Sequence, residues 1–309
     1  MIYTVTLNPA LDKTVEIPHF APGRVNRITA LRTDPGGKGL NVSKVIAKLG
    51  GDSVAFALLG GSTGRAVADA LEGLGVRCHI AWGEGETRTN LKIVDPVRRI
   101  NTDINETGFA VPPALTDGLL DRLTAALRPG DIVVLAGSLP PGAPADTYAT
   151  WITRCKAAGA RVFLDADGAA LAEGLRAKPF LVKPNGEELS RLLGRELRGV
   201  PALADAARQL VASGVENVVV SMGGAGAIYA NADTVLRTEG LSVPVRSTVG
   251  AGDSVVAALA FALGRGMPLH DAAVLSTAVG AANVMCSGTQ AAERSAVEAL
   301  LPKVVCYKI

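Results

Sequence analysis

The chain has 309 residues, of which 48% are hydrophobic and 19% charged, and its formal net charge is +2. This balance is typical of a globular protein with a sizeable core and argues against a disordered tail. The small net charge and the lack of long Lys/Arg runs argue against binding to nucleic acid. The four cysteines have no CxxC spacing and the three histidines are scattered, so neither a disulfide framework nor a His/Cys metal site is favoured.

Residues 1–9 carry no charged leader followed by an apolar core, and they predict a strand, not a signal peptide. No uninterrupted apolar run approaches the roughly 20 residues that a membrane span needs. We therefore expect a soluble, cytoplasmic protein.

Short apolar strands alternate with amphipathic helices along the chain. The pattern predicts strands at residues 2–7, 54–59, 132–136, 162–165, 180–183, 218–221 and 227–229. It predicts helices at residues 39–49, 66–74, 145–158, 187–193, 202–213, 254–264 and 269–286, the last two closing the chain. This alternation is typical of an α/β fold with a mostly parallel sheet, whose ligands bind beyond the carboxyl ends of the strands.

Two segments interrupt this pattern. Residues 14–32 and 87–110 alternate polar and apolar side chains, which predicts antiparallel strands inserted into the α/β body at about 13–35 and 87–110. Together they could form a small sheet that covers the ligand face as a lid. The alternative is a pair of solvent-side hairpins without a role. We expect residues 1–309 to form a single domain that carries these strands.

The most informative segment is a glycine turn before a run of small apolar residues. Gly250, Ala251 and Gly252 would leave backbone N–H groups unpaired beside the positive end of a helix dipole. Such a place attracts anions, phosphates above all. Asp253 follows directly and would suit a base beside developing negative charge. An Asp that merely caps the helix is the alternative.

A second glycine-rich turn, Gly-Gly-Lys-Gly-Leu-Asn, occupies residues 36–41. It is not a P-loop, because Lys38 is followed by Gly39 and not by Ser or Thr, and neither glycine turn completes GxGxxG. The turn predicts a backbone nest with one lysine and one amide, suited to the hydroxyls or phosphate of a small polar ligand. A purely structural turn remains open.

Polar residues also follow predicted strands. Asn185 and Glu188 stand three residues apart at a helix start, where they could meet around hydrated Mg²⁺ or form a capping box. The glycine turn at residues 221–227 suits close approach to a nucleotide or a simple hairpin. Asp12, near the end of the first strand, suits hydroxyl recognition or a turn.

Four motifs together resemble a known family. Residues 8–12 (Asn-Pro-Ala-Leu-Asp), 36–41, 183–185 (Lys-Pro-Asn) and 250–253 (Gly-Ala-Gly-Asp) resemble, in this order, the ribokinase-like PfkB carbohydrate kinases. The resemblance extends from the first strand to the final helices. It implies a three-layer α/β sandwich with a β-sheet lid, and ATP-dependent phosphorylation of a sugar phosphate.

Residues 87–93 and 102–105 of the lid look most similar to those family members that phosphorylate fructose 1-phosphate. Tagatose-6-phosphate kinases and minor 6-phosphofructokinases share the four broad motifs and are the alternatives. An inactive sugar-phosphate sensor is a further alternative, against which the retained Asp253 argues.

The resemblance also implies roles for individual residues. Asp253 would take the proton of the attacking hydroxyl, and an anion hole would form from the amides of Gly250, Ala251 and Gly252. The sugar would be held by Asp12, Gly37, Lys38 and Asn41, and its far end and existing phosphate by Arg88, Asn90 and Ser138. We expect the guanidinium of Arg88 to bind that phosphate through two hydrogen bonds. ATP would be bound by Lys183, Asn185, Ser221, Gly223, Gly226, Ser247 and Thr248.

Cations and a partner are implied as well. Mg²⁺ would lie near Asn185 and Glu188, held through water. A monovalent cation such as K⁺ would lie beside the anion hole, at the carbonyls of Ser247 and Val249 and the segment from Asn283 to Gly288. Lids of this type often pair between subunits, so we expect a homodimer. Two departures from the family pattern, Asp167 before Gly168 and Gly186 after Asn185, concern details of nucleotide binding.

Overall fold

The computed structural model describes residues 1–309 and places most of them in helices or strands. The main strands are β1 (Ile2–Thr6), β4 (Ser53–Gly60), β5 (Arg77–Gly83), β8 (Ile132–Ala136), β9 (Arg161–Asp165), β10 (Leu181–Val182), β11 (Asn217–Ser221), β12 (Ala227–Ala230), β13 (Val235–Thr238) and β14 (Cys306–Lys308). The helices are α1 (Lys38–Lys48), α2 (Gly61–Gly73), α3 (Pro113–Ala126), α4 (Thr147–Ala157), α5 (Gly168–Arg176), α6 (Gly186–Leu193), α7 (Gly199–Ala212), α8 (Ala251–Gly264), α9 (Leu269–Val284) and α10 (Arg294–Leu300). No helix is both long and apolar enough to cross a membrane.

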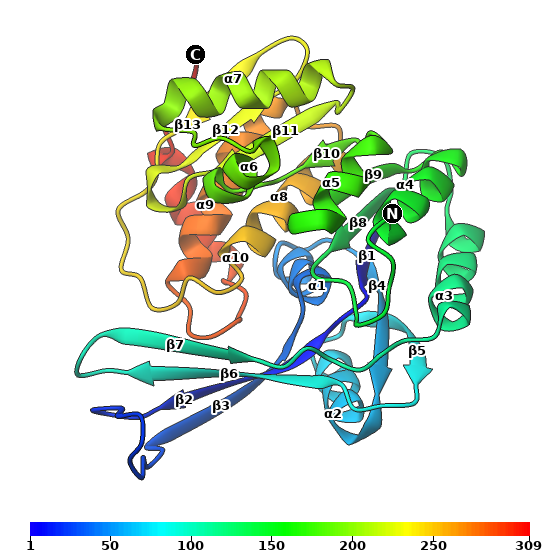
Figure 1. The fold of residues 1–309 in the computed structure, drawn as a ribbon. Coiled ribbons are helices and arrows are strands. Elements are labelled where there is room, and N and C mark those ends of the chain that lie inside the picture. Colours follow the sequence, from blue (N-terminus) through cyan, green and yellow to red (C-terminus); the bar gives the residue numbers. More distant parts are fainter.

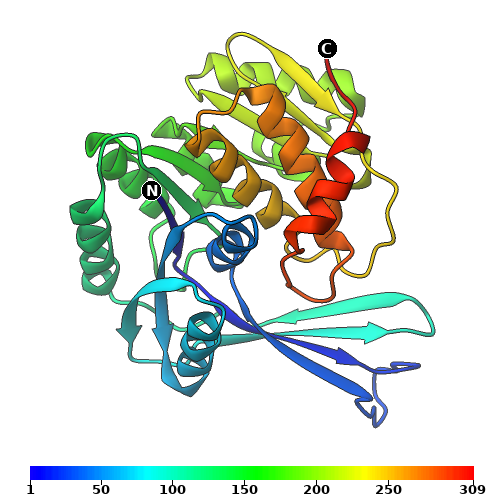
Figure 2. The same cartoon turned by 180° about the vertical axis from the view of Figure 1, so that it is seen from behind.

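These strands form one sheet with helices on both faces (Figures 1 and 2). The strand order is β14-β13-β12-β11-β10-β9-β8-β1-β4-β5. The strands from β11 to β5 run parallel, while β12, β13 and β14 continue the sheet by antiparallel pairing. The predicted three-layer fold with a mostly parallel sheet is therefore confirmed.

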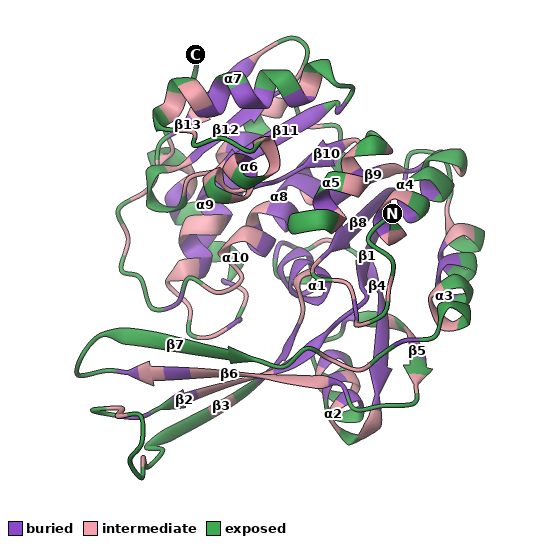
Figure 3. Ribbon diagram, viewed as in Figure 1, coloured by how far each residue is buried: buried purple, intermediate pink, exposed green.

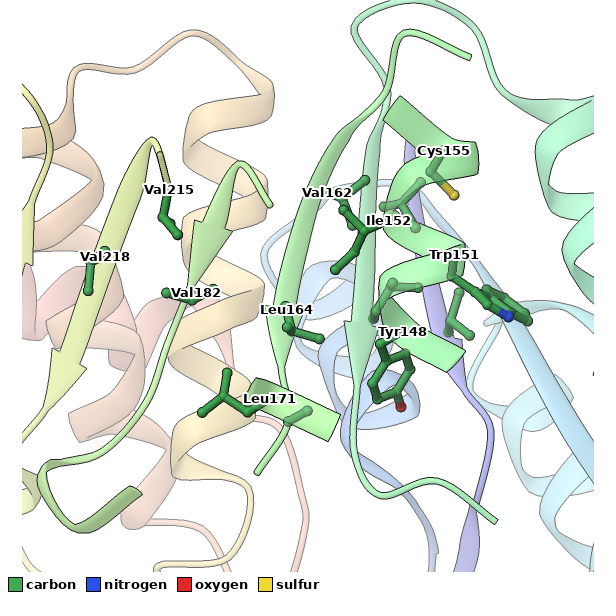
Figure 4. Packing of buried hydrophobic residues seen from close by; sticks show 14 of the residues in the cluster. Tyr148, Trp151, Ile152, Cys155, Val162, Leu164, Leu171, Val182, Val215 and Val218 are labelled. Carbon is green, nitrogen blue, oxygen red and sulfur yellow. The ribbon is translucent and has the colours of Figure 1, made fainter. Parts of the chain in front are cut away.

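Alternating side chains of the central strands supply two cores. In β8, Val133 and Leu135 pack into a cluster on one face, while Ile132 and Val134 pack into the cluster on the other. Tyr148 of α4 belongs to the first cluster, which Figure 4 shows at close range. The second cluster receives residues from α1, α8, α9 and α10. Burial on both faces explains why these strands are continuous apolar runs in the sequence.

Six elements were not predicted: β5, α3, α5, β13, α10 and β14. The expectation that two long helices close the chain is wrong, because α10 and β14 follow α9. The strand β5 lies at a sheet edge and keeps residues such as Arg77 exposed, which removes the apolar run of a buried strand. In α3 only three leucines are buried, so its helical periodicity is weak.

The two inserted segments form a separate four-stranded sheet, the lid, which extends away from the body (Figure 1). Its strands are β2 (Ala10–Glu16), β3 (Ala30–Gly36), β6 (Arg88–Asp95) and β7 (Ile100–Asn105), in the order β3-β2-β6-β7. The predicted antiparallel pairing is correct within each hairpin. It is wrong for β2 and β6, which pair in parallel because both strands leave the body in the same direction.

Candidate active site

A cavity of about 400 Å³ lies where the carboxyl ends of β1 and β8 meet the lid. Every residue predicted to hold the sugar lines this cavity: Asp12, Gly37, Lys38, Asn41, Arg88, Asn90 and Ser138. Gly250 and Asp253 line it too. The fold thus brings together residues from three of the four motifs (8–12, 36–41 and 250–253), with Arg88 and Asn90 of the lid and Ser138. The fourth motif, residues 183–185, does not line this cavity.

Asp253 lies in the first turn of α8 and is only 6% exposed. Gly250 caps this helix with φ +76°, a left-handed conformation that glycine adopts without strain. The Asn41 side-chain amide donates a 2.7 Å hydrogen bond to Oδ2 of Asp253. Burial, and after it the charge of Asp165, raises the pKa of Asp253 to about 6, against the opposing effect of Lys38. Asp253 is therefore ionised at neutral pH and more basic than an exposed aspartate.

The turn before α8 presents free N–H groups. The amides of Gly250, Gly252 and Asp253 donate no hydrogen bond within the protein. The Ala251 amide makes a long bond, 3.3 Å, to the carbonyl of Thr248, so it is less free than the sequence suggested. Beside the positive end of a 14-residue helix, the three free donors suit a phosphoryl group.

A buried carboxylate that the motifs did not reveal stands at the end of β9. Asp165 is 2% exposed, and its Oδ1 lies 3.1 Å from Nζ of Lys38 and 3.5 Å from Nζ of Lys183. Burial alone would raise the pKa of Asp165, but the two lysines outweigh burial and lower it. The available signal was its position at the carboxyl end of a parallel strand.

The two lysines reach Asp165 from different elements. Lys38 begins α1 and lines the sugar cavity. Burial would lower the pKa of Lys38, but Asp165 and Asp253 together raise it. Lys183, which follows β10, lies beneath the glycine turn, since a Cβ added to Gly252 would be 3.3 Å from its Nζ.

One face of the lid is polar and covers the cavity. Asp12 accepts a 2.9 Å hydrogen bond from the Asn90 amide, and burial raises the pKa of Asp12. Nε and Nη2 of Arg88 donate to the carbonyl of Asn8 at 3.2 and 3.0 Å. The guanidinium of Arg88, which we expected to bind a phosphate, therefore donates to the backbone in this structure.

The polar face also holds a lysine that the sequence argument did not use. Lys92 lines the cavity and pairs with Thr14 on β2, two residues beyond the pair formed by Asp12 and Asn90. Its Nζ is 3.4 Å from Oδ1 of Asp103. Lys92 is thus a cation in the outer part of the cavity.

A second pocket, of about 310 Å³, lies on the other side of the glycine turn. Of the predicted ATP-binding residues, it includes Ser221, Gly223, Gly226 and Thr248. Half of its lining is hydrophobic, with side chains such as Leu241, Val243 and Val284. The turn after β11 is a hairpin turn that also lines this pocket, so both interpretations of that segment apply.

Asn185 and Glu188 form a capping box at the start of α6. The side chain of Asn185 accepts from the Glu188 amide at 2.8 Å, and Glu188 Oε2 accepts from the Asn185 amide at 2.9 Å. Asn185 also bridges to Ser221 at the adjacent strand end. The charge of Glu188 contributes to raising the pKa of Lys38. The structure therefore shows the capping interpretation, while leaving Oε1 of Glu188 without a protein donor.

The residues suggested for a monovalent cation lie around the glycine turn. The carbonyl oxygens of Ser247 and Val249 accept no hydrogen bond within the protein. Asn283 lies next to the turn, with its Nδ2 3.7 Å from a Cβ placed on Gly250, and Gly288 lines the same cavity as Val249. Oδ1 of Asn283 accepts from a backbone amide, so that side chain is already used.

Comparison with known proteins agrees with this geometry. The family described as "pfkB family carbohydrate kinase" matches residues 5–296. The chain is 43% identical to a 1-phosphofructokinase of Rhodobacter capsulatus, over 90% of this chain and 88% of that protein. It is 36% identical to a 1-phosphofructokinase of Bacillus subtilis, over 98% of both.

Solved structures show the same fold. Phosphofructokinase-2 from Escherichia coli in complex with substrates and products superimposes with a TM-score of 0.94, at 32% identity and 98% coverage of both chains. The same enzyme in complex with potassium gives a TM-score of 0.93, also at 32% identity and 98% coverage.

Proposed function

The chain belongs to the pfkB family of carbohydrate kinases, and on this premise we propose that it transfers the γ-phosphoryl group of ATP to fructose 1-phosphate, giving fructose 1,6-bisphosphate. The observation that carries this proposal is the position of Asp253. It stands where the polar cavity under the lid meets the glycine turn. The second pocket, with the hydrophobic side chains Leu241, Val243 and Val284, begins on the other side of that turn and is called the apolar pocket below. The names of the relatives from Rhodobacter and Bacillus support the choice of sugar.

Asp253 is the proposed general base. Its carboxylate accepts the proton of the sugar hydroxyl while that oxygen bonds to the γ-phosphorus and the bond from phosphorus to ADP breaks. The Asn41 amide, bonded to Oδ2, fixes the orientation of the base. The free amides of Gly250 and Gly252, with the weakly bonded Ala251 amide, stabilise the charge on the moving phosphoryl group.

The sugar subsite follows from the cavity lining. Asp12, paired with Asn90, accepts from sugar hydroxyls, and Lys38 donates to the sugar near the base. Gly37 and Ser138 contribute close backbone approach and a hydroxyl. The existing phosphate lies at the outer end, where Arg88 needs to turn from its backbone partner or leave the phosphate to Lys92.

The nucleotide lies on the other side of the turn. The apolar pocket suits an adenine ring, and its glycines and Thr248 allow close approach of the chain to ATP. Lys183, Asn185 and Ser247 complete the proposed ATP site. We expect Lys183 to face the phosphates, because it lies beneath Gly252.

We also propose two cations. Asn185 and Glu188 would hold Mg²⁺ through water, and the free Oε1 of Glu188 fits this role. When bound, Mg²⁺ neutralises phosphate charge. The free carbonyls of Ser247 and Val249 fit K⁺, with Asn283 and Gly288 nearby, and potassium is named in the complex of the Escherichia coli enzyme.

A homodimer through the lid is the proposed assembly. The lid exposes apolar side chains, among them Val25, Ile28, Leu31 and Ile104, of which Val25 is 86% exposed. Figure 3 shows how much of this sheet is exposed. Large exposed apolar side chains that gather into a patch mark interaction sites, and we propose that those of the lid do so in the dimer. A cytoplasmic location remains our prediction.

An ADP-release assay tests the function. Wild-type protein is supplied with ATP and, in turn, fructose 1-phosphate, fructose 6-phosphate and tagatose 6-phosphate, and the highest kcat/KM is expected for fructose 1-phosphate. No preference for that sugar would refute the substrate assignment. Binding of sugar phosphate without any turnover would favour the inactive sensor.

The variant Asp253→Asn tests the general base. It should bind ATP but lose about 10²- to 10⁴-fold in kcat, and normal turnover would refute the base assignment.

A further inference from the structure

We propose that Asp165 is a positioning residue that holds Lys38 and Lys183 on the two sides of Asp253. The inference rests on the phosphoryl transfer proposed above. Asp165 itself lines neither the sugar cavity nor the apolar pocket, so it does not contact the substrates from its place at the end of β9. It acts through the two ammonium groups.

The geometry places both lysines on a single oxygen. Oδ1 of Asp165 lies 3.1 Å from Nζ of Lys38 and 3.5 Å from Nζ of Lys183, whereas Oδ2 is buried and has no hydrogen-bond partner. The carboxylate belongs to β9, which pairs with β8 on one side and β10 on the other. A support inside the central sheet is rigid, which is what a positioning residue requires.

The lysines reach different parts of the site. Lys38 faces the sugar cavity, and its side chain is 36% exposed, so without Asp165 it could turn toward water. Lys183 is 6% exposed and lies beneath Gly252, where no such escape exists. Asp165 therefore keeps two like charges close together that would otherwise repel each other in a site of low dielectric.

The balance of charge suits the reaction. Asp165 and Asp253 carry two negative charges, and Lys38 and Lys183 carry two positive ones. When Asp253 accepts the hydroxyl proton, the four groups together become positive by one charge. That change occurs as the negative phosphoryl group reaches the sugar, so the group is stabilised at that moment.

The test begins with Asp165→Asn in the full chain. We expect kcat to fall about 10²-fold, the scale of a misplaced catalytic group, with ATP affinity less affected. In a double-mutant cycle, Asp165→Asn should cost much less in a Lys38→Met background than in wild type, because both changes remove the same arrangement. Additive losses would overturn the proposal.

A pH profile separates positioning from a structural role. The charges that act most on Asp253 are those of Asp165 from β9, Lys38 from α1 and Lys183 after β10, and the buried Lys44 of α1 interacts with it too. The charge of Asp165 raises the pKa of Asp253 by more than the charge of Lys38 lowers it. The acid limb of kcat, which is the fall in kcat below the pKa of Asp253, should therefore move to lower pH in Asp165→Asn even when Lys38 turns toward water. Substrate phosphates also titrate near pH 6, but equally for both proteins, so the difference reports the site. An unchanged limb would contradict the proposal.

Two variants guard against a folding artefact. Asp165→Glu retains the charge and should keep the wild-type acid limb while losing part of kcat. Asp131→Asn is the matched control, since Asp131 is a buried partner of the N-terminal ammonium at 2.7 Å, in the loop before β8 and so at the opposite end of the sheet. It should lower stability without a shift of the limb. Recovery of Asp165→Asn by excess Mg²⁺ would instead make Asp165 a metal ligand and overturn the proposal.

A last readout does not need turnover. Acetic anhydride labels free amines, and mass spectrometry can follow Lys38. In Asp165→Asn, Lys38 should be labelled several-fold faster than in wild type, because it loses its hydrogen-bond partner and the larger of the two aspartate charges that keep it protonated. Unchanged labelling would refute the proposal that Asp165 holds Lys38, even if the proposed sugar were wrong. Faster labelling would support this role of Asp165 independently of the substrate.

Discussion

Replacing Asp253 by asparagine is predicted to stabilise the folded protein at neutral pH while removing most of its turnover. The carboxylate is buried, and its pKa rises from 3.8 to about 6 on folding, with burial as the largest cause. Such a rise makes the ionised form less favourable in the folded state by about 3 kcal/mol. Asparagine has the same shape and no charge, and its new amide could donate to the unpartnered Oδ1 of Asn41.

The sign of the pH dependence follows from linkage. The folded protein binds the Asp253 proton more tightly than the unfolded chain does, so the ionisation of Asp253 reduces stability as the pH rises from 3.8 to about 6. Below this window both states are protonated and the penalty is absent. Above it the penalty is constant. The advantage of Asp253→Asn should therefore be full at about pH 7.5 and much smaller at about pH 4.5.

Thermal unfolding followed by circular dichroism, at both pH values, measures this difference. At about pH 7.5 the variant should have a Tm higher by roughly 2–6 °C. The control is Asp69→Asn on α2, an exposed aspartate, which should change Tm little at either pH. If Asp253→Asn unfolds at a lower temperature than wild type at neutral pH, or if its effect does not depend on pH, the reasoning on burial is refuted.

Four further predictions concern the site and the lid. The kcat of wild type should fall about tenfold per pH unit below pH 6, because protonated Asp253 cannot accept a proton; a flat coupled-assay profile down to about pH 5 would contradict this. Gly226→Ala should weaken ATP binding in calorimetry at least about tenfold, since φ is +95° and a Cβ there collides with a carbonyl of β13, whereas Gly118→Ala on α3, with open space and outside both pockets, should bind normally. Ile104→Glu should shift a lid-paired dimer toward monomer in sedimentation, and an unchanged mass would exclude this surface. Lys92→Met should lower kcat/KM about tenfold or more for fructose 1-phosphate but not for fructose, and an equal loss on both sugars would show that Lys92 does not bind the phosphate.

The parts of the fold that the sequence predicted are those with a local signal. Buried parallel strands such as β8 are continuous apolar runs, and the helix beginning at Ala251 follows a glycine turn, so both were found within a few residues. The lid hairpins were found by their alternation. Their parallel junction was not, because alternating strands fit either direction of pairing and nothing local selects one.

The functional site, like the fold, has some residues with a local sequence signal and others without one. Asp253, Lys38 and the glycine turns lie in short motifs, whereas the role of Asp165 depends on three separate segments that meet only in the folded sheet. The direction of the Arg88 fork is likewise invisible in the sequence, because its partner is a backbone carbonyl that follows β1. A motif gives the type of a side chain but does not show which groups of the folded protein form hydrogen bonds with it.

This limit applies to the base itself. The motif identifies Asp253, but its basicity is set by burial and by charges on β9, on α1 and after β10, none of which the motif contains. Because Lys38 and Lys183 lower the pKa of Asp253 while Asp165 raises it, a change at any of the three should alter the pH dependence of turnover without touching the base. A kinase of this fold can therefore retain Gly-Ala-Gly-Asp unchanged and still work in a different pH range.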